Sequence, residues 1–77
     1  MDELFDQLRK TLGANVKRLR RAKDLSQEEL AFQAEIDRTY VSQIERAVIN
    51  PSLFVLHRLG IALGVQVQEL LESHEQH

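Results

Sequence analysis

What the 77-residue sequence lacks narrows the possibilities first. It contains no cysteine, which excludes disulfide scaffolds, thiolate metal sites and cysteine nucleophiles. Its purely apolar runs extend over only a few residues, well below the roughly 20 that a membrane-spanning helix needs. The acidic start at Met1-Asp2-Glu3 has neither the basic region nor the small-residue cleavage site of a signal peptide. We therefore expect a cytoplasmic protein.

Basic residues are concentrated in one segment, although the formal net charge is −2. Positions 9–23 contain seven of the ten Lys and Arg residues and no acid. A local basic surface matters more for nucleic-acid binding than the total charge does. Such a segment is also typical of a solvated helix face, so it indicates a nucleic-acid partner only together with other features.

The hydrophobic pattern is helical along almost the whole chain and predicts one all-α domain of five helices over residues 1–77. The first helix has an apolar stripe at spacings of three and four residues, formed by Leu4, Leu8, Leu12, Val16 and Leu19. Gly13 is a candidate break in this helix, which should end near Asp24. Residues 1–11 would be an N-terminal helical extension, and residues 73–77 would form a frayed tail.

Two short helices follow. Ser26 and Glu29 form a capping box, which predicts the start of a second helix of about nine residues. Asp37 is the expected N-cap of a third helix, roughly Arg38 to Arg46. A tight link joins the two, and this arrangement is a helix-turn-helix.

The rest of the chain predicts two more helices. Asn50-Pro51-Ser52 is the clearest interruption, and Ser52 should cap a fourth helix that Gly64 closes. The inward side chains of this helix are expected to be Leu53, Leu56, Leu59 and Leu63. A short fifth helix, about Val67 to Glu72, would contribute Leu70 and Leu71.

The third helix should bury Val41 and Ile44 and turn its polar side chains outward: Arg38, Thr39, Tyr40, Ser42 and Gln43. In the major groove, arginine can donate two hydrogen bonds to guanine, glutamine can pair with adenine, and a threonine methyl can contact thymine. The alternative is that these are ordinary exposed helix residues. An outward Arg-Thr-Tyr triplet without an acid is unusual for a face that contacts only water.

Several runs resemble the Xre/Cro/CI-type repressors, a family of helix-turn-helix regulators. The runs are Leu25-Ser26-Gln27-Glu28-Glu29-Leu30-Ala31, Tyr40-Val41-Ser42-Gln43-Ile44-Glu45-Arg46 and Asn50-Pro51-Ser52-Leu53, followed by Ala62-Leu63-Gly64-Val65 and Glu69-Leu70. The resemblance covers about Leu12 to Leu71 and implies a lambda-repressor-like DNA-binding domain. Within the family, Ile36-Asp37-Arg38-Thr39-Tyr40-Val41-Ser42 is similar to restriction–modification controller proteins, which are short dimeric regulators; other short Xre-type regulators share the triplet.

The resemblance also implies roles for individual residues. The bases would be read by Arg38, Thr39, Tyr40 and Gln43. The phosphate backbone would be contacted by Gln27, Ser42, Arg46 and Asn50. Arg20 and Glu45 match a buried ion pair that connects the first helix to the third, which is the recognition helix.

The sequence departs from the family pattern in the loop after the recognition helix. Ala47 stands where the family usually has glycine, and apolar Val48 and Ile49 replace polar or basic residues. The fourth helix also has apolar residues at positions expected to point away from the core. With the N-terminal Leu4, Phe5 and Leu8, these favour a dimer interface through helices four and five, formed by Phe54, Val55, Ile61 and Leu71.

We therefore predict a sequence-specific regulator that binds double-stranded DNA as a homodimer on a palindromic operator. No cofactor, metal, membrane or small-molecule ligand is implied. His74 and His77 lack a third ligand, and no nucleophile has a plausible base, so an enzyme is not expected. The alternative is a protein-interaction module, antitoxin-like or partner-binding, that retains the fold; weak, salt-insensitive DNA binding would favour it.

Overall fold

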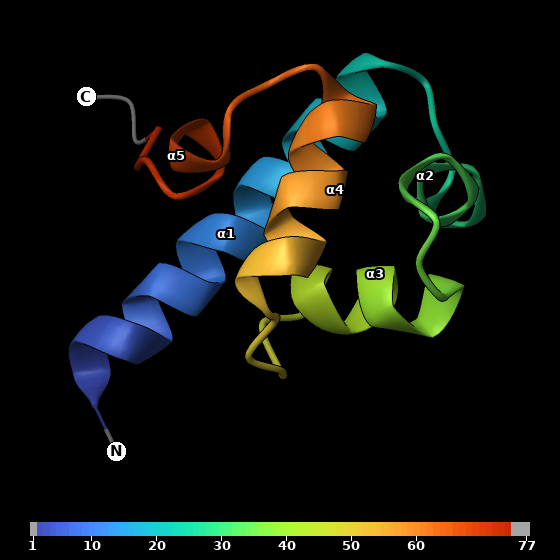
Figure 1. The fold of residues 1–77 in the computed structure, drawn as a ribbon. Coiled ribbons are helices and arrows are strands. Elements are labelled where there is room, and N and C mark those ends of the chain that lie inside the picture. The colour runs from blue at the N-terminus through green and yellow to red at the C-terminus, as the bar shows by residue number, and fades with distance from the viewer. Residues whose placement is uncertain (1, 75–77) are drawn as a thin grey trace.

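The computed structural model describes residues 2–74, and every regular element in this range is an α-helix. The helices are α1 (Glu3–Ala22), α2 (Gln27–Ala34), α3 (Arg38–Glu45), α4 (Leu53–Leu63) and α5 (Val67–Leu70). This architecture confirms the predicted all-α class with five helices (Figure 1). The predicted fraying of residues 75–77 lies outside the described residues.

Local hydrogen bonds set the start of α2, as the sequence predicted. The Ser26 hydroxyl accepts from the Glu29 N–H at 3.0 Å, and the Glu29 carboxylate accepts from the Ser26 N–H at 2.8 Å. Hydrogen bonds from the Ser26 N–H and, to a smaller extent, from the Ser26 side chain favour the charged carboxylate and hold the pKa of Glu29 below its ordinary value. Upstream, α1 ends at Ala22, and Asp24 takes a left-handed φ of 57° in the turn.

The other predicted caps are also present. The Asp37 carboxylate accepts from the Thr39 N–H at 2.7 Å at the start of α3. The Ser52 hydroxyl accepts from the Val55 N–H at 3.1 Å at the start of α4. Gly64, with φ 75°, ends that helix in the left-handed conformation that suits glycine. The helix boundaries therefore follow from side chains close to them in sequence.

Gly13 does not break α1, which runs as one helix of 20 residues. A Cβ atom at this position would lie 2.6 Å from the Ile44 carbonyl oxygen and 2.8 Å from that of Glu45. Glycine is therefore needed here because α1 crosses the C-terminal end of α3 at close range. The candidate break was a wrong interpretation of a packing requirement.

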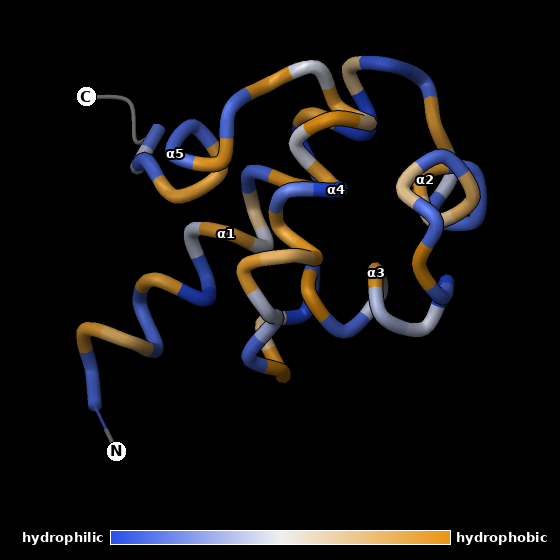
Figure 2. Tube along the Cα trace, viewed as in Figure 1, coloured by the Kyte–Doolittle hydropathy of each residue, from blue (hydrophilic) through white to orange (hydrophobic). Residues whose placement is uncertain are grey.

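All five helices contribute side chains to the core, and Figure 2 shows hydrophobic and hydrophilic residues alternating along the helices. The buried side chains of the core are Leu12, Val16, Leu30, Ala31, Ala34, Val41, Ile44, Val55, Leu56, Leu59, Leu63 and Leu70. Asn15 is a buried polar residue among them, and its Nδ2 donates to the carbonyl oxygens of Leu70 and Glu72 at 2.8 and 2.7 Å. These two bonds attach the C-terminal end of α5 to α1.

Two predictions for α4 were wrong. Leu53, expected inside, is 73% exposed, and Val55, expected to point away from the core, is buried. Leu53 is the first residue of α4, and its side chain stays exposed although Val55 and Leu56 in the same turn are buried. Phe54 and Ile61 are exposed as expected, while Leu71 is half-buried against the core.

The first turns of α1 project beyond the other helices, at the lower left of Figure 1. Leu4, Phe5 and Leu8 in these turns are all exposed. Within residues 2–74, none of the helices is both long and apolar enough to cross a membrane.

Candidate nucleic-acid interface

The first turn of α3 presents Arg38 and Thr39 to solvent, and both side chains are exposed. The opposite side of α3 carries Val41 and Ile44, which are buried against the rest of the domain. Gln43 is half-buried, one turn further along. The helix therefore lies on the surface, along the lower edge of Figure 1, with its N-terminal turn free to contact another molecule.

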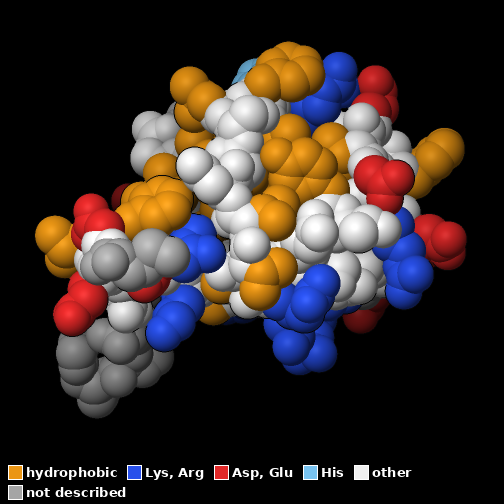
Figure 3. Space-filling view, turned by 90° about the horizontal axis from the view of Figure 1, so that it is seen from below, with side chains coloured by type: hydrophobic (Ala, Val, Ile, Leu, Met, Phe, Trp, Pro, Cys, Tyr) orange, Lys and Arg blue, Asp and Glu red, His pale blue; other side chains and the backbone are white. Residues whose placement is uncertain are grey.

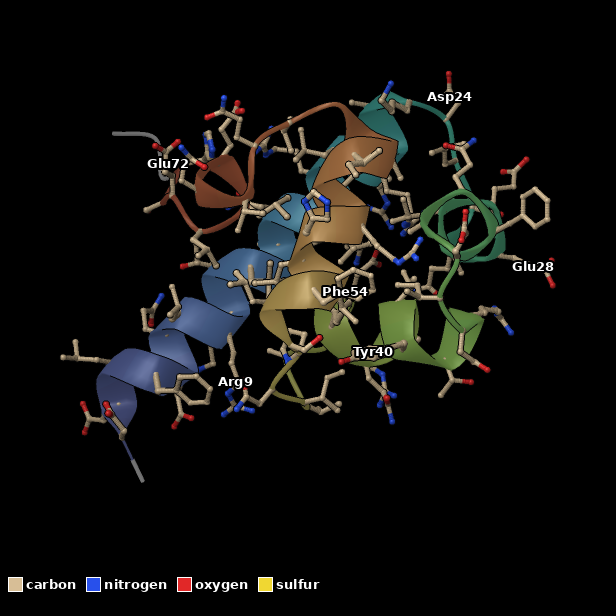
Figure 4. The ribbon with its side chains drawn as sticks, viewed as in Figure 1. Arg9, Asp24, Glu28, Tyr40, Phe54 and Glu72 are labelled. Atoms are coloured by element: carbon tan, nitrogen blue, oxygen red, sulfur yellow. The ribbon has the colours of Figure 1, made fainter. Side chains whose placement is uncertain are left out.

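Tyr40, like Gln43, is less exposed than Arg38 and Thr39, the other two predicted base-reading residues. It was expected to point outward, but its side chain is half-buried and packs against the core. Its hydroxyl accepts from the Ser52 N–H at 3.4 Å, so it also contacts the start of α4 (Figure 4). The prediction of a freely exposed Tyr40 was wrong, because an aromatic ring this size can cover the core edge while its hydroxyl stays near solvent.

The start of α2 lies beside α3. Gln27, a predicted phosphate contact, is half-buried, and its Nε2 donates to Glu45 Oε1 at 3.1 Å. Gln27 and Arg38 line the same open depression, together with Arg20, Ser26 and Glu28. The structure thus brings the N-terminal ends of α2 and α3 to one surface, as a helix-turn-helix requires.

The predicted ion pair between Arg20 and Glu45 is present. Arg20 Nε and Nη2 donate to the two Glu45 carboxylate oxygens at 2.7 and 3.0 Å, and both side chains are at least nine-tenths buried. The hydrogen bond to Glu45 raises the pKa of Arg20. Arg20 Nη1 also donates to the Leu25 carbonyl oxygen at 2.8 Å. This pair fixes the position of α3 relative to α1.

The loop after α3, residues 46–52, carries two of the predicted phosphate contacts. Arg46 and Asn50 are both exposed. Arg46 Nε donates to the hydroxyl of Ser42, a third predicted contact, at 3.4 Å. Ala47 adopts a left-handed φ of 61°, the conformation for which glycine is favoured. Val48, next to it, is 53% exposed, whereas Ile49 is half-buried against the core, so only Val48 adds clearly exposed apolar surface to the loop.

The basic segment is only partly available to a ligand. Arg20 is buried in its ion pair, and Arg9 is partly buried in contacts with Asp6 and Ala47. The remaining cations of positions 9–23 are exposed: Lys10, Lys17, Arg18, Arg21 and Lys23. Figure 3 shows the face viewed from below Figure 1, where most of the Lys and Arg side chains lie in the lower half and hydrophobic side chains lie across the middle.

Sequence reasoning missed the hydrogen bond from Arg9 Nη1 to the Ala47 carbonyl oxygen, 2.9 Å long. The partners are 38 positions apart, and no local pattern connects them. The departure from glycine at Ala47 was the one available signal, and it marked only one end of the contact. The structure contains no group of three or more metal-ligating side chains within residues 2–74; His77 lies outside the described residues.

Residues 16–70 match the family described as Helix-turn-helix. The chain belongs to this helix-turn-helix family. Control protein C.BamHI from Bacillus amyloliquefaciens is 41% identical over 70 residues, which cover 90% of this chain and 86% of that protein. The structure is similar to that of the restriction-modification controller protein C.AhdI from Aeromonas hydrophila, with a TM-score of 0.78, 42% identity and coverage of 80% of this chain and 94% of the other.

A second solved structure is that of SinR, the master regulator for biofilm formation, in complex with DNA. SinR is a Bacillus subtilis protein. The TM-score is 0.76 and the identity 37%, with coverage of 79% of this chain and 98% of that one. The family match and the relatives confirm the predicted fold and the resemblance to Xre-type regulators, including controller proteins. They also confirm the prediction of a transcription regulator rather than an enzyme. The contacts assigned to individual residues stay predictions.

Proposed function

We propose that this helix-turn-helix chain regulates transcription as a homodimer that binds a two-fold symmetric DNA site. The observation that carries the proposal is the exposed N-terminal turn of α3 beside the start of α2. In proteins of this architecture, that turn enters the major groove while the preceding helix contacts the backbone. SinR, whose structure was solved with DNA, shares the fold of this chain, and this supports the proposal.

In the proposed complex, Arg38 and Thr39 read base edges first because they are exposed in the first turn of α3. Arg38 donates its two parallel N–H groups to a guanine, and the Thr39 methyl contacts a thymine. Gln43 follows one turn later and pairs with an adenine. Tyr40, which is held against the core, contributes through its hydroxyl edge.

The proposed phosphate contacts flank this helix on both sides. Gln27 lies in the first turn of α2, where the helix dipole favours an anion. Ser42, Arg46 and Asn50 lie near the other end of α3 and in the following loop. Contacts on both sides of the recognition helix would fix its register in the groove.

The dimer interface is proposed on the outer face of α4. Phe54 is 60% exposed and Ile61 is 69% exposed, one on each half of the same helix. The guanidinium carbon of Arg58 lies 4.8 Å from the centre of the Phe54 ring, which orients the ring at the surface (Figure 4). Leu71, a further predicted contact, is half-buried and lines a hollow with Leu8 and Leu56. Val55 lies in the core and supports the interface only from beneath.

Arg38→Ala tests the recognition helix. Specificity is measured for the wild type and the variant by selecting bound duplexes from a random library. The expected result is a loss of preference at one position in each half-site, with about 1–3 kcal/mol lower affinity for the wild-type site. Arg21→Ala, which removes an exposed cation from α1, is the matched control and should leave every base preference in place. An unchanged consensus for Arg38→Ala would contradict the assignment.

A further inference from the structure

Arg9 lies outside residues 16–70, which match the helix-turn-helix family, yet it contacts the loop next to the recognition helix. Its Nη1 donates to the Ala47 carbonyl oxygen at 2.9 Å, and its Nη2 donates to the Asp6 carboxylate. The guanidinium carbon lies 5.4 Å from the centre of the Phe5 ring. Figure 4 shows this side chain between α1 and the loop. Arg9 thus bridges the N-terminal extension and residues 46–52.

These contacts make Arg9 unsuited to direct binding of a phosphate. Its side chain is only 22% exposed, and its Nε is buried without a hydrogen-bond partner. Burying an unpaired donor costs free energy that a solvated surface arginine avoids. The planar guanidinium instead holds two fixed partners at once, which a lysine ammonium cannot do with the same geometry.

The loop needs such a contact because of its backbone conformation. The left-handed φ of 61° at Ala47 is unfavourable for a residue with a Cβ atom. The carbonyl group of this strained residue is the group that accepts from Arg9. Phe5 and Leu8 of the extension also line one hollow together with Asn50 and Pro51 of the loop, so the two segments lie near each other on this side of Arg9.

We propose that Arg9 is a positioning residue for DNA binding. It holds the 46–52 loop in the conformation that directs Arg46 and Asn50, on either side of Ala47, at the phosphate backbone. The N-terminal extension is therefore part of the DNA-binding unit. This inference rests on the proposed function, because it assumes that the loop faces DNA.

The test compares Arg9→Ala and Arg9→Lys with the wild type on the duplex that the wild type selects. Arg9→Ala should lower the affinity about tenfold and reduce the slope of log affinity against log salt by about one, as loss of a single phosphate contact does. Arg9→Lys keeps the charge but not the planar fork, so its affinity should resemble that of Arg9→Ala. Gln7→Ala changes an exposed, uncharged position of the same helix and should change the affinity less than twofold. Wild-type affinity in Arg9→Ala would overturn the proposal.

A background that lacks both loop contacts, Arg46→Ala with Asn50→Ala, separates an indirect role from a direct one. If Arg9 acts through these two residues, adding Arg9→Ala should cause little further loss of affinity or of salt slope. If Arg9 contacts a phosphate itself, the two losses add. Additive losses would overturn the proposed positioning role.

Amide hydrogen exchange in the free protein tests the loop without DNA. The Val48 N–H donates to the Gln43 carbonyl oxygen at 3.1 Å, and the Leu30 N–H donates to that of Ser26 at 3.0 Å. In Arg9→Ala, the Val48 amide should exchange about tenfold faster while the Leu30 amide, which reports on the folded domain, stays unchanged. Unchanged protection at Val48 would overturn this inference alone. Failure of the wild type to bind any duplex would overturn the proposed function instead.

Discussion

Arg20 and Glu45 form a bidentate ion pair between α1 and the end of α3, with N–O distances of 2.7 and 3.0 Å. Glu45 also accepts from Gln27 at the start of α2, and Arg20 donates to the Leu25 carbonyl oxygen in the turn between α1 and α2. One buried pair therefore connects α1, the turn after it, the start of α2 and the end of α3. The relative position of α2 and α3 depends on it.

Removing either partner should destabilise the protein strongly. In Arg20→Ala or Glu45→Ala, an uncompensated charge remains buried, so we expect a loss of about 3–5 kcal/mol in the free energy of unfolding. Chemical denaturation measures it. Arg58→Ala is the control: it removes the Arg58–Glu35 pair, in which Glu35 is 73% exposed, and should cost less than about 1 kcal/mol. Equal small losses in all three variants would contradict a structural role for the buried pair.

Gly13→Ala should also destabilise the protein, although alanine favours a helix by about 1 kcal/mol over glycine. The added Cβ would lie 2.6 Å from the Ile44 carbonyl oxygen, so α1 and α3 must separate. We expect a net loss of about 1–3 kcal/mol by chemical denaturation, in the range of overpacked cores. Lys17→Ala, at an exposed position of the same helix, should stay within about 0.5 kcal/mol of the wild type. A more stable Gly13→Ala would show that the two helices are not this close.

Ala47→Gly, in contrast, should stabilise the protein. Glycine tolerates the φ of 61° at this position, and the relief should exceed the entropy that glycine adds to the unfolded chain, for a gain of up to about 1 kcal/mol. Thermal unfolding compares the variant with Ala14→Gly, at an exposed position within α1. That control should lose about 1 kcal/mol, because glycine disfavours a helix. A loss of stability in Ala47→Gly would exclude a left-handed residue in this loop.

The proposed dimer interface can be tested by placing a charged residue on it. Phe54→Glu places an anion on the outer face of α4 and should shift the protein to monomers in sedimentation velocity experiments. Phe32→Glu is a closely matched control, because Phe32 is also an exposed phenylalanine, at 83%, but lies on α2. It should leave the sedimentation coefficient unchanged. An unaltered profile for Phe54→Glu would remove Phe54 from the interface.

The sequence predicted features that depend on neighbours along the chain. The Ser26–Glu29 capping box, the Asp37 cap and the Gly64 terminus were all predicted, because each involves groups within four positions of one another. The resemblance to known repressors implied the Arg20–Glu45 pair, which no local pattern could have revealed. The recognition helix was predicted from its cap and polar residues.

The wrong predictions concern tertiary packing between helices, which a local sequence pattern does not show. Periodicity assigned Leu53 to the inward side of α4, but as the first residue of the helix it lies with its side chain exposed, while Val55 and Leu56 in the same turn are buried. Periodicity also failed to show that Val55 is buried in the core. Tyr40 was placed outside, because a pattern does not show where an aromatic ring folds back on the core. The Arg9–Ala47 contact required the crossing of α1 and the loop after α3 to be known.

Sequence-specific DNA binding by a dimer is tested most directly by selecting bound duplexes from a random DNA library and repeating the selection across a salt series. We predict a palindromic consensus whose half-sites lie about one helical turn, 34–36 Å, apart, with an affinity that falls steeply as salt rises. If no sequence were enriched and binding were weak and almost independent of salt, the result would contradict sequence-specific DNA binding by a dimer. The helix-turn-helix would then serve a protein partner, through the apolar surface around Val48 and Phe54.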